Sequence, residues 1–472
     1  MNLPPSPTEL QNLTKAQAVD LLPMLGHNNA HLQALAQALL ERARSNAAQG
    51  MGAMVHIATD PGLAHATALP LHGLPLLVKD NVDVAQMPTT AGSPVLAGHV
   101  PHTSAEAIAR LQSAGAIVLG KTNLHELCFG ITSNNATYGP VRNPYAPDRI
   151  AGGSSGGTAA AVAAGLAPAG IGTDTGGSLR IPAALCGVVG FRPTTGRWPS
   201  SGVVTISGTR DTVGPIARSA ADCALLDAVV CGEPLVLPAV SLEGLRIGVP
   251  RPLFWQTLEP SMERAANSML ATLAQAGVEL VECDVGIDSA ECTQAGMVVA
   301  MAEALGCLKS YMTGHGLPFD AAQIAAKVAS PDVRGIFESL VSTNAPSKQA
   351  YAHALQVLRP ALRQLYADCF ARHQLQALVF PTTPLPAALI GEDDTVLLAG
   401  QQVSTFLTFT RNVGPGSFAG IPGISVPMGC NQAGLPLGMA LDGPEDSDRT
   451  LLAIAHAVQA LLPPMPAPPH RF

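Results

Sequence analysis

Three parts of this chain repeat one local pattern, a helix-like segment that runs directly into a short apolar segment. The pairs are AIARLQSAG before AIVLG, SMERAANSMLATLAQAG before VELVEC, and LRQLYADCFARHQLQ before ALVFP. Apolar residues at three- and four-residue spacing predict helices, and short apolar runs predict buried strands. Because helices and apolar strands alternate, we predict an α/β fold in which helices cover both faces of a sheet.

Four segments of the chain differ in composition. Residues 1–50 are helix-like, residues 65–230 contain the densest glycine clusters, residues 232–375 carry longer amphipathic segments, and residues 376–465 return to apolar strands and turns. We predict that residues 232–375 form a helical region packed on the sheet. At about 100–200 residues per domain, length alone leaves open several domains or one large domain with an insert.

Charge and cysteine content exclude several classes of protein. The 26 Lys and Arg against 34 Asp and Glu give a net charge of −8, the wrong sign for a general nucleic-acid binder. The nine cysteines form no CxxC pair, so neither a zinc knuckle nor a disulfide framework is indicated. The first residues lack the basic and apolar regions of a signal peptide, and no apolar run is long enough for a bilayer. We therefore expect a cytoplasmic protein with no nucleic-acid or membrane partner.

Glycine and serine are concentrated in two loops, GGSSGGT at 152–158 and TDTGGSLR at 173–180, and a helix-like segment follows each. Backbone N–H groups that converge in such loops at helix N-termini stabilise an anion. One glycine-rich loop is often only a tight turn. Two of them, both containing serine, favour a catalytic site.

Known short motifs do not account for these loops. Gly152-x-Ser154-x-Gly156 matches the nucleophile elbow of α/β-hydrolases, but APDRIA precedes it where that elbow needs an apolar strand. The P-loop lysine and the third glycine of a dinucleotide fingerprint are both missing. His125 and Glu126 do not form HExxH. We therefore expect no metal and no organic cofactor.

A serine nucleophile requires a base, and no histidine lies between His125 and His315. Lys79 follows the apolar run LPLLV, and burial would favour its neutral, basic form. A lysine in this position is also typical of a surface residue whose aliphatic part covers apolar groups. The residue pattern alone leaves both interpretations open.

Three blocks together resemble the core of the amidase signature family. They are LPLLVKDNVDVAQMPTTAGS, AGGSSGGTAAAVAAG and GTDTGGSLRIPAALCGVVGFRPTTGR, with Ser154 75 residues after Lys79 and Ser178 24 residues further on. Three further segments, KTNLHELCFG, FPTTP and GIPGISVP, also resemble the family and extend the resemblance over most of the chain. It implies a single domain over residues 1–472, built on a central mixed, twisted sheet.

The resemblance assigns a role to each matching residue. It implies that Ser178 is the nucleophile, that Ser154 is a bridging serine on a cis peptide, and that Lys79 is the base in a reaction through an acyl-enzyme. It also implies three supporting sets: oxyanion-hole amides at Thr175, Gly176, Gly177 and Ser178; structural support from Ser155, Asp174 and Arg180; and substrate contacts at Phe129, Gly130 and Ile131.

Within the family, TSNNATYGPVRNPY and GPEDSDRTLL are most similar to hydrolases of the mandelamide and indoleacetamide type. This implies a small, aryl-substituted amide as substrate, and a homodimer is common among such enzymes. Two alternatives stay open: a carbamate (urethane) or ureide hydrolase with the same three residues, and the glutamine-hydrolysing subunit of a tRNA-dependent amidotransferase. Residues from about 285 to 345 contain no motif that assigns a pocket.

Overall fold

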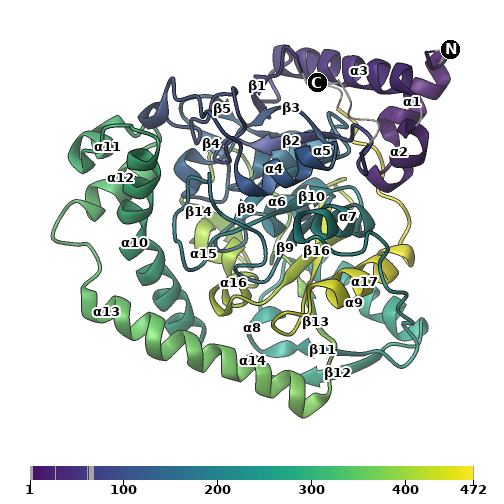
Figure 1. The fold of residues 1–472 in the computed structure, drawn as a ribbon. Helices are drawn as coiled ribbons and strands as arrows, with labels where there is room; N and C mark the ends of the chain where they lie inside the picture. The colour runs from purple at the N-terminus through teal and green to yellow at the C-terminus, as the bar shows by residue number, and fades with distance from the viewer. Residues whose placement is uncertain (1–3, 27, 61, 63–68, 471–472) are drawn as a thin grey trace.

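A large mixed sheet forms the centre of the computed structural model, which describes residues 4–26, 28–60, 62 and 69–470 (Figure 1). The outermost ends of the predicted 1–472 domain and the first positions of the predicted 65–230 segment lie outside the described residues. In spatial order the eleven strands are β1 (Met54–Ile57), β3 (Ile117–Thr122), β2 (Pro75–Lys79), β8 (Ala169–Asp174), β10 (Thr212–Ala217), β9 (Val189–Arg192), β16 (Gly423–Cys430), β17 (Pro436–Asp442), β13 (Ala377–Pro381), β11 (Arg246–Pro250) and β12 (Glu279–Cys283).

Parallel and antiparallel pairings both occur in this sheet. Strand β2 pairs in parallel with β3 and β8, and β11 pairs in parallel with β12 and β13. Strand β10 is antiparallel to both of its neighbours. Every residue of β3, β8 and β10 is buried. Because successive side chains point to opposite faces, both faces are covered there, which confirms the predicted α/β class.

The predicted helix-to-strand units are all present. Helix α4 (Glu106–Ser113) precedes β3, α9 (Pro260–Gln275) precedes β12, and α14 (Arg359–His373) precedes β13. Two helices that begin directly after the glycine-rich loops, α5 (Gly156–Ala163) and α6 (Arg180–Cys186), pack against each other and against central strands. The two loops therefore lie side by side in the structure.

Residues 232–375 are mainly helical but also supply strands β11 and β12 at one edge of the sheet. Their helices α10 (Ser289–Gly314), α11 (Ala321–Lys327), α12 (Pro331–Leu340) and α13 (Lys348–His353) form, with α14, the green arm around one side of the sheet in Figure 1. At the opposite side lie α1 (Pro7–Lys15), α2 (Ala18–Leu25) and α3 (Asn29–Ala48).

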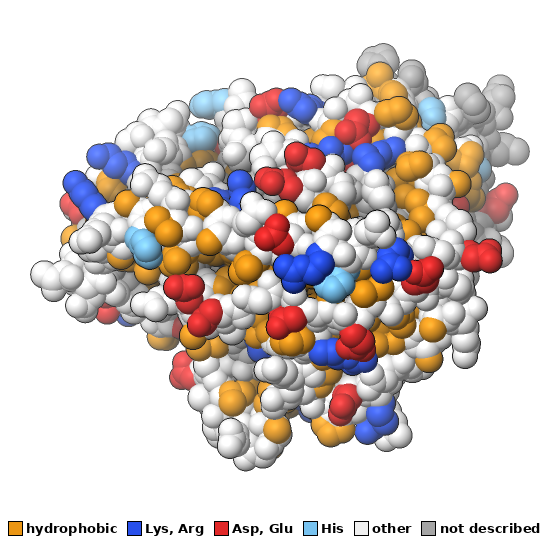
Figure 2. All heavy atoms as spheres, turned by 90° about the horizontal axis from the view of Figure 1, so that it is seen from below, with side chains coloured by type: hydrophobic (Ala, Val, Ile, Leu, Met, Phe, Trp, Pro, Cys, Tyr) orange, Lys and Arg blue, Asp and Glu red, His pale blue; other side chains and the backbone are white. Residues whose placement is uncertain are grey.

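The surface seen in Figure 2 carries basic and acidic side chains interspersed with one another. The net charge of −8 therefore does not produce a single acidic patch on that face. Among the described helices, none combines the length and the apolar character that crossing a bilayer requires.

Candidate active site

Strand pairing brings the predicted residues together. Strands β2 and β8 are parallel neighbours, with Val78 opposite Ile171, so the ends at Lys79 and Asp174 lie at the same edge of the sheet. Across this edge the Ser155 amide donates to the Ser178 carbonyl oxygen at 3.3 Å, which joins the two glycine-rich loops. Residues far apart in the sequence thus meet at one site.

Lys79 is fully buried, with no exposed surface. Its Nζ lies 2.8 Å from Ser154 Oγ and 2.8 Å from Thr173 Oγ1. Burial lowers the pKa of Lys79 because the charged ammonium loses its hydration, and nearby Cys128 and Asp211 oppose this effect only in part. The surface-lysine interpretation of the sequence is therefore wrong, because the side chain is buried and lies against two hydroxyl groups.

The peptide bond between Gly153 and Ser154 is cis, as the resemblance implied. The Ser154 carbonyl accepts from the His125 amide at 3.2 Å and from Ser133 Oγ at 3.4 Å. A Cβ atom at Gly153 would lie 2.9 Å from Ser133 Oγ and 3.0 Å from the Ile131 carbonyl carbon. Glycine is therefore needed at this position for the loop to approach its neighbours.

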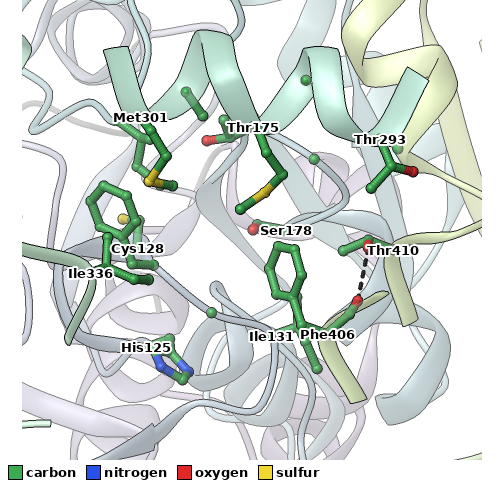
Figure 3. Close-up of a pocket in the computed structure, with 18 of the residues that line it drawn as sticks. His125, Cys128, Ile131, Thr175, Ser178, Thr293, Met301, Ile336, Phe406 and Thr410 are labelled. Carbon is green, nitrogen blue, oxygen red and sulfur yellow. Dashed lines mark hydrogen bonds between the residues drawn. The ribbon is translucent and has the colours of Figure 1, made fainter. Parts of the chain in front are cut away.

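Ser178 precedes α6 and lies in the wall of a cavity of about 310 Å³, with 8% of its surface exposed. Figure 3 shows Ser178 at the centre of the surrounding side chains. Thr175 and Gly176 line the same cavity. The Gly177 amide instead donates to Asp174 Oδ1 at 2.7 Å, so this N–H is directed at a carboxylate.

The predicted supporting residues lie directly behind the Ser178 loop. Asp174 accepts hydrogen bonds from the Leu179 amide at 3.1 Å and from Arg180 Nε at 3.2 Å, and Arg192 Nε lies 3.4 Å from it. Burial alone would raise the pKa of Asp174, but the two arginines outweigh it and lower that pKa to about 2. Ser155 stands before α5, yet its hydroxyl donates to the Thr173 carbonyl at 3.1 Å and does not cap the helix.

The predicted substrate contacts Phe129, Gly130 and Ile131 all line the cavity. The opposite wall comes from α10, which sequence reasoning did not assign to the site. One face of this helix lies over Ser178, as Figure 3 shows for Met301 and Thr293. Its lining residues are Cys292, Thr293, Gly296, Met297, Ala300 and Met301. Their three- to four-residue spacing is a helical signal, but it does not say which cavity the face covers.

Most charged groups in the cavity wall are already paired within the protein, whereas Asp394 is exposed. His125 Nε2 lies 2.8 Å from Asp332 Oδ2, and Asp393 Oδ1 accepts from Thr132 Oγ1 at 2.7 Å. Arg210 donates to the Gly296 carbonyl. The remaining wall is largely apolar, and Phe129, Ile336, Phe406 and Phe418 contribute to it. Such a cavity suits a neutral ligand with an apolar body.

Comparisons with known proteins agree with this geometry. The amidase family model matches residues 26–452. An indoleacetamide hydrolase of Agrobacterium vitis is 42% identical over 88% of this chain and 91% of its own length. A mandelamide hydrolase of Pseudomonas putida is 40% identical over 85% of this chain and 80% of its own length.

The fold comparison points the same way. The solved structure of a peptide amidase from Stenotrophomonas maltophilia superimposes with a TM-score of 0.80 at 31% identity and covers 93% of this chain and 95% of its own. A family model and several relatives thus agree over nearly the whole length. This chain belongs to the amidase signature family and is an amidase, a hydrolase of carbon–nitrogen bonds in amides.

Proposed function

We propose that this amidase hydrolyses small, aryl-substituted amides through a triad of Ser178, Ser154 and Lys79. One observation carries the proposal: the 2.8 Å contact between Lys79 Nζ and Ser154 Oγ, buried behind an apolar cavity in which Ser178 lies. A neutral amine in contact with a hydroxyl can accept its proton, so the pair provides general-base chemistry without histidine.

In the acylation step, Ser178 Oγ attacks the amide carbonyl carbon and gives its proton to Ser154 Oγ, while Ser154 gives its own proton to Lys79 Nζ. The carbonyl oxygen becomes an oxyanion, which the amides of Thr175, Gly176 and Ser178 stabilise by roughly 3–4 kcal/mol per donor. Because the Gly177 N–H already faces Asp174, we assign it to holding the loop.

Collapse of the tetrahedral intermediate breaks the C–N bond. The leaving amine takes the proton back from Lys79 through Ser154, and the acyl group stays on Ser178 as an ester. Water then attacks this ester with the same base, releases the carboxylic acid and restores the Ser178 hydroxyl. Protons balance over the cycle, and one water molecule is consumed for each amide.

The choice of an aryl group rests on the shape and chemistry of the cavity. Its volume of about 310 Å³ and its Met, Ile and Phe side chains suit an aromatic ring. Two relatives, named after indoleacetamide and mandelamide, give independent support, since both of these amides carry aromatic rings.

The test measures ammonia or amine release from indole-3-acetamide, phenylacetamide, an aryl carbamate and glutamine, with hydroxylamine present to trap the acyl-enzyme. We expect turnover of the aryl amides and formation of the matching hydroxamates. Ser178→Ala should abolish both, whereas Ser201→Ala, at an exposed serine, should change neither. Turnover of the carbamate alone or of glutamine alone would replace the proposed substrate class. Hydroxamate formation by Ser178→Ala would refute the nucleophile.

A further inference from the structure

A second cavity, of about 620 Å³, lies on the other side of α10 and shares none of its described lining residues with the catalytic cavity. Tyr311 and His315, at the end of α10, line it. Asp83 and His99 come from distant parts of the chain and lie beside them. One ligand atom from each of Asp83, His99 and His315 falls within 4.8 Å of the others.

The hydrogen bonds of His315 fix which of its nitrogens carries a proton. Nδ1 lies 2.9 Å from the Tyr311 carbonyl oxygen, which can only accept, so Nδ1 carries the hydrogen. In the neutral ring the lone pair is then on Nε2. This Nε2 lies 3.1 Å from Asp83 Oδ2. The Nε2 lone pair therefore repels the carboxylate oxygen unless a positive charge lies between the two atoms.

The surrounding contacts match those expected around a metal ion. The Tyr311 hydroxyl donates to Asp83 Oδ1 at 2.6 Å and leaves Oδ2 for another partner. The Tyr311 oxygen also lies 3.0 Å from His99 Nε2, which donates to it, so the lone pair that His99 can offer to an ion is on Nδ1. The Tyr311 carbonyl orients His315 in the way that backbone oxygens orient histidines bound to zinc. Two ligands about 2.1 Å from a tetrahedral ion lie roughly 3.4 Å apart, close to the separation between Asp83 and His315.

Burial and access also fit. Asp83 is 1% exposed, His99 is 8% exposed and the His315 side chain is 23% exposed. Two ligands are thus held in the interior, and the third borders the open cavity. The nearby Lys121 Nζ lies 3.3 Å from Asp80, which is its direct partner, while Asp83 interacts with Lys121 only at longer range.

From this geometry we propose that Asp83, His99 and His315 bind a divalent first-row metal ion of the zinc type, with the second cavity as its entrance. Two imidazoles and one carboxylate are a common donor set for such ions and leave a coordination position for water. The site is separate from the Ser178 cavity, so the ion has no part in the amidase reaction.

Isothermal titration of the chelator-treated full-length protein with ZnCl₂ tests the proposal, and the absorption bands of bound Co²⁺ report the geometry. We expect one saturable site per chain. Loss of an outer-sphere partner typically weakens metal binding roughly 10–100-fold. Asp83→Asn and His315→Gln each remove a direct ligand, so each should weaken zinc binding by at least that factor. Tyr311→Phe should weaken it by about tenfold through its effect on Asp83.

His353→Gln is the matched control, because it removes an exposed histidine from α13. It should leave zinc affinity and stoichiometry unchanged. Without metal, His315→Gln should unfold at the same temperature as wild type and hydrolyse amides at the same rate. The absence of saturable binding, or equal zinc affinity in wild type and His315→Gln, would overturn the proposal. A protonated His315 in a protein that binds no zinc would also overturn it, because a proton would then supply the charge.

Discussion

The Thr173 hydroxyl lies 2.8 Å from Lys79 Nζ, on the strand next to that of the lysine, and both residues are buried. A neutral lysine has two N–H donors and one lone pair. If one N–H is directed at Thr173, the amine is held against rotation and its lone pair can point to Ser154. In the proposed mechanism, Thr173 is therefore a positioning residue for the base.

Thr173→Val removes that acceptor and keeps the shape of the side chain. We expect kcat/KM to fall about tenfold, since a lost hydrogen bond of roughly 1–1.5 kcal/mol corresponds to that factor. Thr158→Val is the control, because its hydroxyl contacts Thr122 and not the lysine. Equal losses in both variants, measured at several pH values, would show that only packing was changed.

The pH dependence of hydrolysis should follow the protonation of Lys79. Burial lowers the pKa of Lys79 below its usual value near 10.5, so the neutral form predominates above the lowered pKa and activity rises with pH through it. We expect kcat/KM on an uncharged amide to fall about tenfold per pH unit on the acid side. A rate that is constant down to pH 5 would contradict a lysine base.

Asp174→Asn should destabilise the fold. Because the folded pKa of Asp174 is about 2, below that of an unfolded aspartate, its stabilisation is present above about pH 4 and is lost as pH falls toward 2. At pH 7 the amide leaves Arg180 and Arg192 without this carboxylate, at a cost of about 3–5 kcal/mol. Urea unfolding measures this free energy.

Glu282→Gln provides the comparison, because it removes a carboxylate from an exposed pair with Arg251. The expected loss is below about 1 kcal/mol, since solvent screens such pairs. Similar losses in Glu282→Gln and Asp174→Asn would show that the buried cluster contributes no more than a surface ion pair.

Met297→Ala and Met301→Ala should widen the cavity beside Ser178. We expect KM for aryl amides to rise about tenfold in each variant, since roughly 0.8 kcal/mol of apolar contact is lost per methylene. The KM for acetamide, which is too small to reach these side chains, should change little. Met24→Ala, at an exposed position, is the control. An unchanged KM for the aryl substrates would place the ring elsewhere.

Much of the fold, and the set of residues proposed here as the reaction centre, could be predicted from the sequence. The helix-to-strand alternation predicted the covered sheet, because period and hydrophobicity are local properties. Lys79, Ser154 and Ser178 could be proposed as catalytic residues from their resemblance to a family, whereas the residue pattern alone could not distinguish a surface lysine from a buried one. Burial decides that question, and burial depends on strand pairing.

Other parts could not be predicted from local pattern. Thr173 is one of several threonines in the chain, and only the register of β2 and β8 brings it to Lys79. The lining face of α10 has helical spacing, but its orientation depends on packing against distant segments. Asp83, His99 and His315 follow no motif spacing, because their proximity is a property of the tertiary structure.

The two walls of the catalytic cavity have consequences for how such an enzyme can diversify. The proposed reacting groups lie on strands and loops between residues 79 and 180, as do Phe129, Gly130 and Ile131 of the cavity wall, whereas a further six lining residues belong to α10. Substitutions along one face of a single helix can therefore alter the preferred acyl group while the proton-transfer chain stays intact. Part of the cavity wall is thus encoded apart from the proposed reacting groups, so residues of α10 can change while Lys79, Ser154 and Ser178 stay in place.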